Sequence, residues 1–254
     1  MLFRSHNSEH GEVIAFVESH IEQGPVLLNE GLAVGVVTAI AGATRLRVSI
    51  TGLAGHAGTV PMGARQDALT AAAEMILFVE SYCTKNAGLV GTVGIVSVKP
   101  GAVNVIPQDV EFTIDVRSSD DANRMNALSA LTEELAIIAK RRNVALASSV
   151  FFSSNAAPCD AGLQRQFEQA ISAHGIAPRY LPSGAGHDAM VFPAVAPTAM
   201  LFVRCGNNGI SHHPDETMTA EDAEIATSVL LHFFEHYEPP QFSASNAQRV
   251  DRQI

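Results

Sequence analysis

The sequence predicts a mixed α/β fold in which a two-layer sandwich is inserted into a second, discontinuous α/β domain. Two observations lead to this prediction. Strand and helix patterns in the middle of the chain follow the order βαββαβ, and the less regular segments on both sides contain further strands and helices. The order βαββαβ is typical of a ferredoxin-like sandwich, in which two helices cover one face of a sheet. With 254 residues, the chain is long enough for both units.

The middle of the chain has the clearest periodicity. Residues 45–51 alternate between apolar and polar side chains, as in a half-buried strand. Residues 66–83 place apolar side chains at a spacing of three to four, as in an amphipathic helix. The elements expected after these are strands at 89–98 and 110–117, a helix that follows capping residues at 118–120, and a strand at 144–152.

The flanking segments supply the elements of the second domain. Glu12 to Ile21 fits either a strand or a helix, and Thr198 to Val203 indicates a buried strand. Helices are expected at 162–174 and 220–237. We therefore predict that residues 1–42 and 151–237 form one domain, that 43–150 form the inserted domain, and that 238–254 form a flexible tail.

Charge and composition exclude two classes of partner. With 26 acidic and 16 basic side chains, the net charge is -10, which repels nucleic-acid phosphates and anionic lipid headgroups. The sequence has no apolar run long enough to span a membrane and no apolar core of a secretory signal near its start, so we expect a cytoplasmic protein. Its three cysteines are widely separated and odd in number, which favours buried free thiols.

Two segments combine histidine with carboxylates next to Gly or Pro. One is HIEQGP, which contains His20, and the other is GISHHPDE, which contains His212. A neutral imidazole with a nearby carboxylate is the usual arrangement in zinc-type sites, and loops at element ends are where such side chains are presented. Taken alone, however, either histidine is more often a surface or core residue than a ligand.

The inserted domain contains three further candidates. His56 lies among small residues in GLAGHAGTVPM, which permits close approach of a ligand or a partner chain, although a glycine-rich turn with an exposed histidine is equally compatible. Asn104 and Arg117 lie on or near strands of the same sheet, and a guanidinium suits bidentate capture of a substrate carboxylate. The alternative for Arg117 is a surface ion pair with Asp115 or Asp120.

The segment SGAGHDA, residues 183–189, precedes an expected helix start and could offer backbone N–H groups to an anion. It lacks the Lys and the Gly spacing of a phosphate-binding loop. The pair His187 and Asp188 invites comparison with a Ser-His-Asp triad, but the sequence contains no Gly-x-Ser-x-Gly elbow. Serine hydrolase chemistry is therefore not favoured.

Taken in chain order, these segments resemble the signature of the M20-type amidohydrolases, the hydantoinase/carbamoylase group that includes allantoate amidohydrolase, N-carbamoyl-L-amino-acid hydrolase and β-ureidopropionase. The segments are HIEQGP, GLAGHAGTVPM, NVIP, DVRS, SGAGHDA and SHHPDE, within residues 12–237. The resemblance implies that the flanks form part of a zinc-peptidase-like catalytic domain and that the insertion is a dimerisation or lid domain. It further implies that the chain pairs as a homodimer through the insertion.

The resemblance also implies a role for each candidate. His20 and His212 would be metal ligands, and His56 would reach the active site of the other subunit to stabilise charge on the scissile carbonyl. The residues implied to bind substrate or line its pocket are Asn104, Arg117, Gly186 and His187. Two divalent ions, zinc or manganese or else cobalt, would activate water for hydrolysis of a linear ureido C–N bond.

The implied substrate is a small ureido acid. Thr59 to Met62 and Gly42 to Leu46 look more similar to allantoate amidohydrolases than to carbamoylases, so allantoate is preferred and an N-carbamoyl-L-amino acid is the alternative. A dinuclear aminopeptidase of the same superfamily is less favoured, because Arg117 and the small residues around His56 suit a short anionic substrate.

Family members also carry upstream segments with a His-x-Asp motif, a bridging Asp and a Glu-Glu pair, and none of these precedes His20 here. We therefore expect the chain alone to hold metal weakly and to need an N-terminal partner chain. A hypothesis of another class is a non-catalytic paralogue or dimerisation module.

Overall fold

The computed structural model describes residues 13–239, which divide into two units. One unit contains described residues 13–40 and 157–239, and the other contains residues 41–156. The sequence placed the domain boundaries after residues 42 and 150. The predicted tail lies outside the described residues from 240 onward.

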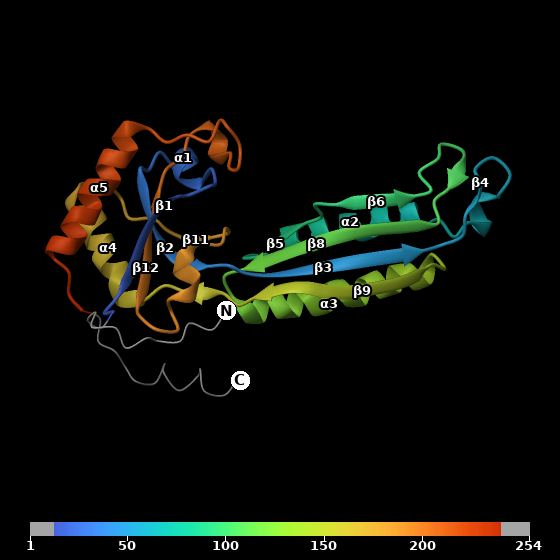
Figure 1. Ribbon diagram of the computed structural model, residues 1–254, viewed down its shortest axis with the longest axis horizontal. Coiled ribbons are helices and arrows are strands. Elements are labelled where there is room, and N and C mark those ends of the chain that lie inside the picture. The colour runs from blue at the N-terminus through green and yellow to red at the C-terminus, as the bar shows by residue number, and fades with distance from the viewer. Residues whose placement is uncertain (1–12, 240–254) are drawn as a thin grey trace. The chain divides into compact units, whose positions relative to one another are not determined.

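The first unit is built on a mixed sheet (Figure 1). Its strands lie in the order β1, β12, β2 and β10, and β11 also pairs with β2. The strands are β1 Phe16–Ile21, β2 Val34–Ile40, β10 Ala157–Pro158, β11 Tyr180–Ser183 and β12 Thr198–Val203. β1 runs parallel to β12 and pairs with no other strand among the described residues. The segment that fitted either a strand or a helix is therefore an edge strand.

Helices cover both faces of this sheet. They are α1 Val26–Glu30, α4 Ala161–Ala173 and α5 Ala220–Glu235, with short 3₁₀ turns η2 Asp188–Val191 and η3 Asn207–Gly209. On β12, Ala199, Leu201 and Val203 pack with α4 and α5, whereas Met200 and Phe202 pack with α1 and η2. Every residue of β12 is buried because alternate side chains meet a covered face on each side. The buried strand predicted at 198–203 is confirmed.

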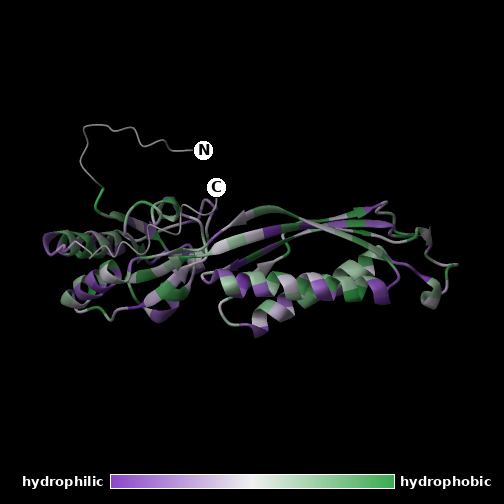
Figure 2. Ribbon diagram, turned by 90° about the horizontal axis from the view of Figure 1, so that it is seen from below, coloured by the Kyte–Doolittle hydropathy of each residue, from purple (hydrophilic) through white to green (hydrophobic). Residues whose placement is uncertain are grey.

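The second unit is an antiparallel sheet with two helices along one face (Figure 2). The sheet order is β5, β8, β3 and β9, and β6 also pairs with β8. The elements are β3 Gly42–Thr51, β4 Gly55–His56, η1 Met62–Ala64, α2 Ala68–Lys85, β5 Val90–Thr92, β6 Val96–Lys99, β7 Val105–Ile106, β8 Asp109–Ser118, α3 Asp121–Arg141 and β9 Ala145–Ser154. This is the order expected for βαββαβ, so the predicted sandwich is confirmed.

Local signals explain where these elements begin. The side chains of Asp67 and Asp120 accept two backbone N–H groups each at the starts of α2 and α3, and Asp120 lies within the predicted capping segment. One difference from the sequence prediction is the strand expected at 89–98, which is two short strands separated at 93–95. Gly94 lies in this break, where a residue without a side chain weakens a strand.

Two other expectations concern cysteines and membrane spans. Cys83, Cys159 and Cys205 are free and buried, as predicted, and burial raises the pKa of the Cys159 thiol to about 11. Within residues 13–239, none of the helices is both long and apolar enough to cross a membrane.

Candidate metal centre

Two potential metal donors lie on the edge strand β1. Glu18 and His20 are two residues apart, so their side chains point to the same face of the sheet. They pair in register with Met200 and Phe202 of β12, whose side chains pack on the face that carries α1 and η2. The alternation of β1 thus aims a carboxylate and an imidazole at one place.

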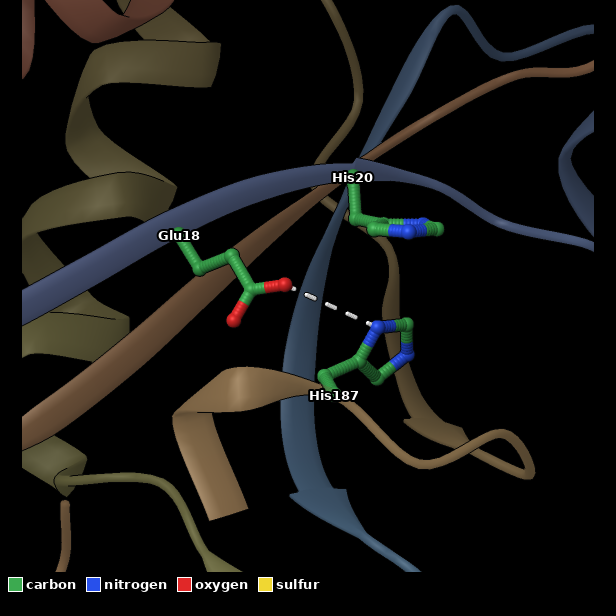
Figure 3. A group of neighbouring side chains, drawn as sticks. All are labelled: Glu18, His20 and His187. Carbon is green, nitrogen blue, oxygen red and sulfur yellow. Dashed lines mark ion pairs between the residues drawn. The ribbon is translucent and has the colours of Figure 1, made fainter. Parts of the chain in front are cut away.

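The third donor, His187, comes from the loop between β11 and η2 (Figure 3). Its ring lies edge-on to that of His20, with centroids 4.5 Å apart, and it also contacts the ring of Phe202. One donor atom from each of Glu18, His20 and His187 lies within 4.8 Å of the others, and no other group of three or more such residues within 13–239 meets this condition. Two imidazoles and one carboxylate form the ligand set of many zinc-type centres.

Hydrogen bonds determine which ring nitrogens can accept a metal. The hydroxyl of Ser183 donates its one proton to the carbonyl of Ala185. In the 2.7 Å hydrogen bond between Ser183 Oγ and His187 Nε2, the ring nitrogen is therefore the donor. His187 Nδ1 is then the unprotonated nitrogen. In His20, Nδ1 donates to the carbonyl of Ile21 at 2.8 Å, which leaves Nε2 unprotonated.

This arrangement places two hydrogen-bond acceptors, Nδ1 of His187 and a carboxylate oxygen of Glu18, opposite each other. Oε1 of Glu18 lies 3.7 Å from Nδ1 of His187, which is too far for a hydrogen bond, while Oε2 of Glu18 accepts the backbone N–H of Ala189 at 2.8 Å. Burial, together with the charge of His20, lowers the pKa of His187 to about 4, an effect that Asp188 partly offsets. A proton is therefore disfavoured between the two acceptors at neutral pH, and a divalent cation fits their chemistry.

His212 is not one of these three donors, but its segment packs against that of His20. The side-chain amide of Gln23 donates to Ser211 Oγ at 2.7 Å. Gly209 has a φ of +72° and lies so close to Gly24 that an added Cβ would fall 2.2 Å from the Gly24 carbonyl carbon. His212 itself is exposed and has a left-handed φ of +57°, an uncommon conformation for a residue other than glycine. The two predicted histidine motifs are thus brought together, and the role of His212 stays a prediction.

In the second unit, His56 and Asn104 lie together at one end of the sheet. His56 is exposed and pairs with Val105 in the short β4–β7 ladder. The carbonyl of Asn104 accepts the N–H of Ala57 at 3.0 Å, and His56 Nδ1 accepts the N–H of Gly58. The small residues around His56 allow the backbone to turn closely at this histidine, as expected from the glycines in the segment.

Arg117 lies near the other end of the same sheet and is paired with Asp115. Its Nε and Nη2 atoms donate to the two carboxylate oxygens of Asp115, each at 2.9 Å, and Asp115 also accepts from Arg45. Burial raises the pKa of the Asp115 carboxyl, but the hydrogen bonds and charges of Arg117 and Arg45 outweigh this and lower it. The ion pair considered as the alternative for Arg117 is therefore present, and a substrate carboxylate would have to compete with Asp115.

Sequence reasoning missed two members of the centre. Glu18 was not singled out because residues 12–21 fitted a helix as well as a strand, although the spacing Glu18-x-His20 places both on one face of a strand. In the sequence, Ser183 stands out only as the first residue of a glycine-containing segment. His187 was predicted to line the substrate pocket together with Gly186, and here its ring lies among the candidate metal donors.

These features define a mixed α/β protein with a candidate centre for a divalent metal at the edge of a sheet. The chain belongs to peptidase family M20/M25/M40, whose family model matches residues 4–236. The predicted resemblance to the hydantoinase/carbamoylase group is confirmed by individual relatives.

Two curated relatives and one solved structure illustrate this similarity. The chain is 40% identical to an N-carbamoyl-L-amino acid amidohydrolase of Geobacillus stearothermophilus, over 87% of this chain and 54% of the relative. It is 39% identical to allantoate deiminase 2 of Glycine max, over 88% of this chain and 52% of the relative. A crystal structure of a hydantoinase/carbamoylase family amidase from Burkholderia multivorans superposes with a TM-score of 0.85 at 38% identity, over 87% of this chain and 54% of the amidase. The chain spans about half the length of the relatives it matches.

Proposed function

We propose that this chain is part of a metal-dependent amidohydrolase that cleaves a linear ureido C–N bond, with allantoate as the preferred substrate. The observation that carries the proposal is the convergence of Glu18, His20 and His187, in which one donor atom of each residue lies within 4.8 Å of the others. The names of the relatives support the ureido chemistry.

The chain's own residues would act mainly by holding and orienting. Glu18 Oε1, His20 Nε2 and His187 Nδ1 are the atoms that would bind a divalent ion, either zinc or manganese, or else cobalt. Such an ion supplies Lewis-acid chemistry at a carbonyl and lowers the pKa of water. Ser183 fixes the proton on His187 Nε2, and the Ala189 N–H fixes the Glu18 carboxylate. The complete site would hold two ions, the second with ligands that include His212.

The spacing of the predicted substrate residues supports a homodimer. Arg117 is eight positions along β8 from Asp109, which at about 3.4 Å per residue is about 27 Å. His56 lies at the Asp109 end, because the strand that precedes it, β3, pairs Thr51 with Asp109 (Figure 1). One small acid cannot touch His56 and Arg117 of the same sheet. If both residues serve one substrate, they come from two subunits, as the resemblance implies.

The edge strand β9 offers a surface for this pairing. β9 pairs only with β3 among the described strands, and its ten residues include no charged side chain and no proline. Val150, Phe151 and Phe152 are 52%, 50% and 41% exposed. Long, uncharged edge strands with exposed apolar side chains tend to pair with another strand. A second copy of the chain is the partner that we propose for β9.

A further polypeptide segment could reach the metal centre along β1. This strand carries Glu18 and His20 and has an edge without a strand partner within the described residues. The N-terminal partner expected from the resemblance would therefore add at this edge and supply further ligands.

The preference for allantoate is supported by sequence similarity in short segments rather than by overall identity, which is about equal for the two substrate names. One of those segments includes Thr44, whose hydroxyl is buried and accepts from Nη1 of the buried Arg124 at 2.8 Å. Thr44 thus serves the core, so the preference for allantoate depends on Thr59 to Met62, which lie in a largely exposed loop. N-Carbamoyl-L-amino acids remain the alternative substrates.

The proposal is tested by measuring ammonia and urea release from allantoate and from an N-carbamoyl-L-amino acid. The chain is assayed with Zn²⁺ or Mn²⁺, both alone and with an N-terminal segment of a relative added in trans. We expect metal-dependent turnover in at least one arrangement, and its loss in His187→Ala. If neither substrate is hydrolysed in any arrangement, the non-catalytic module becomes the better explanation.

A further inference from the structure

Three histidines outside the metal centre cluster where two helices end. His174 follows the last residue of α4, while His232 and His236 lie in and just after the last turn of α5. The ring centroids of His174 and His232 are 5.7 Å apart, and those of His232 and His236 are 4.2 Å apart. The two helices hold this arrangement because they pack together on one face of the sheet, where the rings of Phe167 and Phe233 stack at 4.2 Å.

Backbone hydrogen bonds determine the tautomer of two of these rings, that is, which ring nitrogen carries the proton. His174 Nδ1 lies 2.8 Å from the carbonyl of Ala170, and His236 Nδ1 lies 2.9 Å from the carbonyl of His232. A carbonyl can only accept, so each Nδ1 carries the proton and each Nε2 is left with its lone pair. A ring N–H bonded to a backbone carbonyl is also the usual second contact of a metal-binding histidine.

The position of the cluster favours a cation. Both α4 and α5 present their carboxyl-terminal ends here, where the unpaired carbonyls give a partial negative charge. His174 and His236 are exposed and His232 is partly exposed, so an ion can reach them from solvent. His232 and His236 are four residues apart and therefore lie on the same face of their helix.

We infer that His174, His232 and His236 form a second, surface site for a transition-metal ion such as Zn²⁺, Ni²⁺ or Cu²⁺. Imidazole nitrogens suit these ions and do not suit Mg²⁺ or Ca²⁺. Unlike the donors of the Glu18 centre, the three rings do not yet converge. They close around the ion by rotation of these exposed or partly exposed side chains, for which the terminal histidine torsion is soft.

This site is distinct from the Glu18 centre. The histidine cluster belongs to α4 and α5, on one face of the sheet, while Glu18, His20 and His187 lie on the face that carries α1 and η2. The inference therefore does not depend on the proposed function, and each site can be removed without changing a residue of the other.

The test is equilibrium dialysis of the full chain against Zn²⁺ and, separately, Ni²⁺. It compares the unaltered chain with His174→Ala, His236→Ala and the control Asn126→Ala, at an exposed position on α3 of the other unit. We expect each cluster variant to lose one bound ion or to bind it at least about tenfold more weakly, since removal of even a group that only hydrogen-bonds to a metal ligand costs about 10- to 100-fold. Asn126→Ala should bind as the unaltered chain does. Equal ion number and affinity in all four proteins would overturn the inference.

A second measurement uses the unaltered chain, so that it does not depend on the folding of a variant. Histidine side-chain ¹⁵N spectra recorded during Zn²⁺ addition should show the Nε2 signals of His174, His232 and His236 shifting together, with Nδ1 still protonated in His174 and His236. Shifts confined to His20 and His187 would contradict the inference.

Discussion

At the metal centre, the Ser183 hydroxyl accepts from His187 Nε2 and donates to the Ala185 carbonyl. Although Ser183 supplies no ligand, it keeps the lone pair of the imidazole on Nδ1, toward Glu18. The side chain of His187 is 1% exposed, so water cannot easily take over this contact. A buried residue next to the three candidate ligands would thus control whether they can act together.

Replacing this hydroxyl should weaken metal binding. In Ser183→Ala, His187 Nε2 loses its acceptor and the ring can place its proton on Nδ1, toward Glu18. We expect the dissociation constant for Zn²⁺ to rise about 10- to 100-fold, measured by competition with a chromophoric chelator. Ser172→Ala, on an exposed position of α4, is the control. An unchanged affinity in Ser183→Ala would refute the tautomer assignment.

Kinetic measurements can distinguish a substrate-binding role of Arg117 from a structural role in the sheet. If it binds the substrate carboxylate, Arg117→Gln removes charged hydrogen bonds that contribute about 1.5–3 kcal/mol, so KM should rise about 10- to 150-fold with a smaller effect on kcat. Arg47→Gln is a matched control, because Arg47 lies on the neighbouring strand, is 54% exposed and pairs with Glu111. Parallel losses of kcat in both variants would instead indicate a general effect on the sheet.

The elements show what could be predicted from the sequence and what could not. Strict alternation in residues 45–51 and 110–117 predicted β3 and β8, because one face of their sheet is covered by α2 and α3 and the other is polar. β1 was ambiguous, since both of its faces are partly buried and its pattern is short. The meeting of His187 with Glu18 joins residues far apart in the sequence, and local patterns carry no information about it.

The open face of the sandwich sheet should give the protein a pH-dependent stability. Asp115 has a pKa lowered below its ordinary value of 3.8 in the folded state, so its ion pairs stabilise the fold above that value. This contribution is lost as the pH falls through the lower, folded pKa. Urea unfolding between about pH 5 and pH 2 should show the free energy of unfolding falling less steeply in Asp115→Asn. Identical slopes would show that these ion pairs do not contribute.

The edge strand β9 of the same sheet leads to a prediction about assembly. A lysine on an edge strand opposes pairing with another strand. If β9 forms the proposed dimer interface, Val150→Lys should shift the chain toward monomer, as measured by sedimentation velocity. Leu77→Lys, at a 64% exposed position on α2, should leave the assembly unchanged. A dimer that persists in Val150→Lys would place the interface elsewhere.

For the molecule as a whole, family membership and geometry support the same class of chemistry by separate routes. The family model matches residues 4–236, and the convergence of the three donors is a property of their side-chain positions alone. The chain spans about half the length of the relatives that it matches, and the hydrolysis proposed above would draw on a further polypeptide segment. The central proposal for the chain itself is that Glu18, His20 and His187 hold a divalent ion.

The most direct test of that claim is anomalous diffraction from crystals of the chain grown with Zn²⁺ or Mn²⁺. We predict an anomalous peak with Glu18 Oε1, His20 Nε2 and His187 Nδ1 each about 2.0–2.2 Å away, as is usual for these ligand atoms. A metal bound elsewhere, with these three side chains in contact only with protein or water, would contradict the proposed centre.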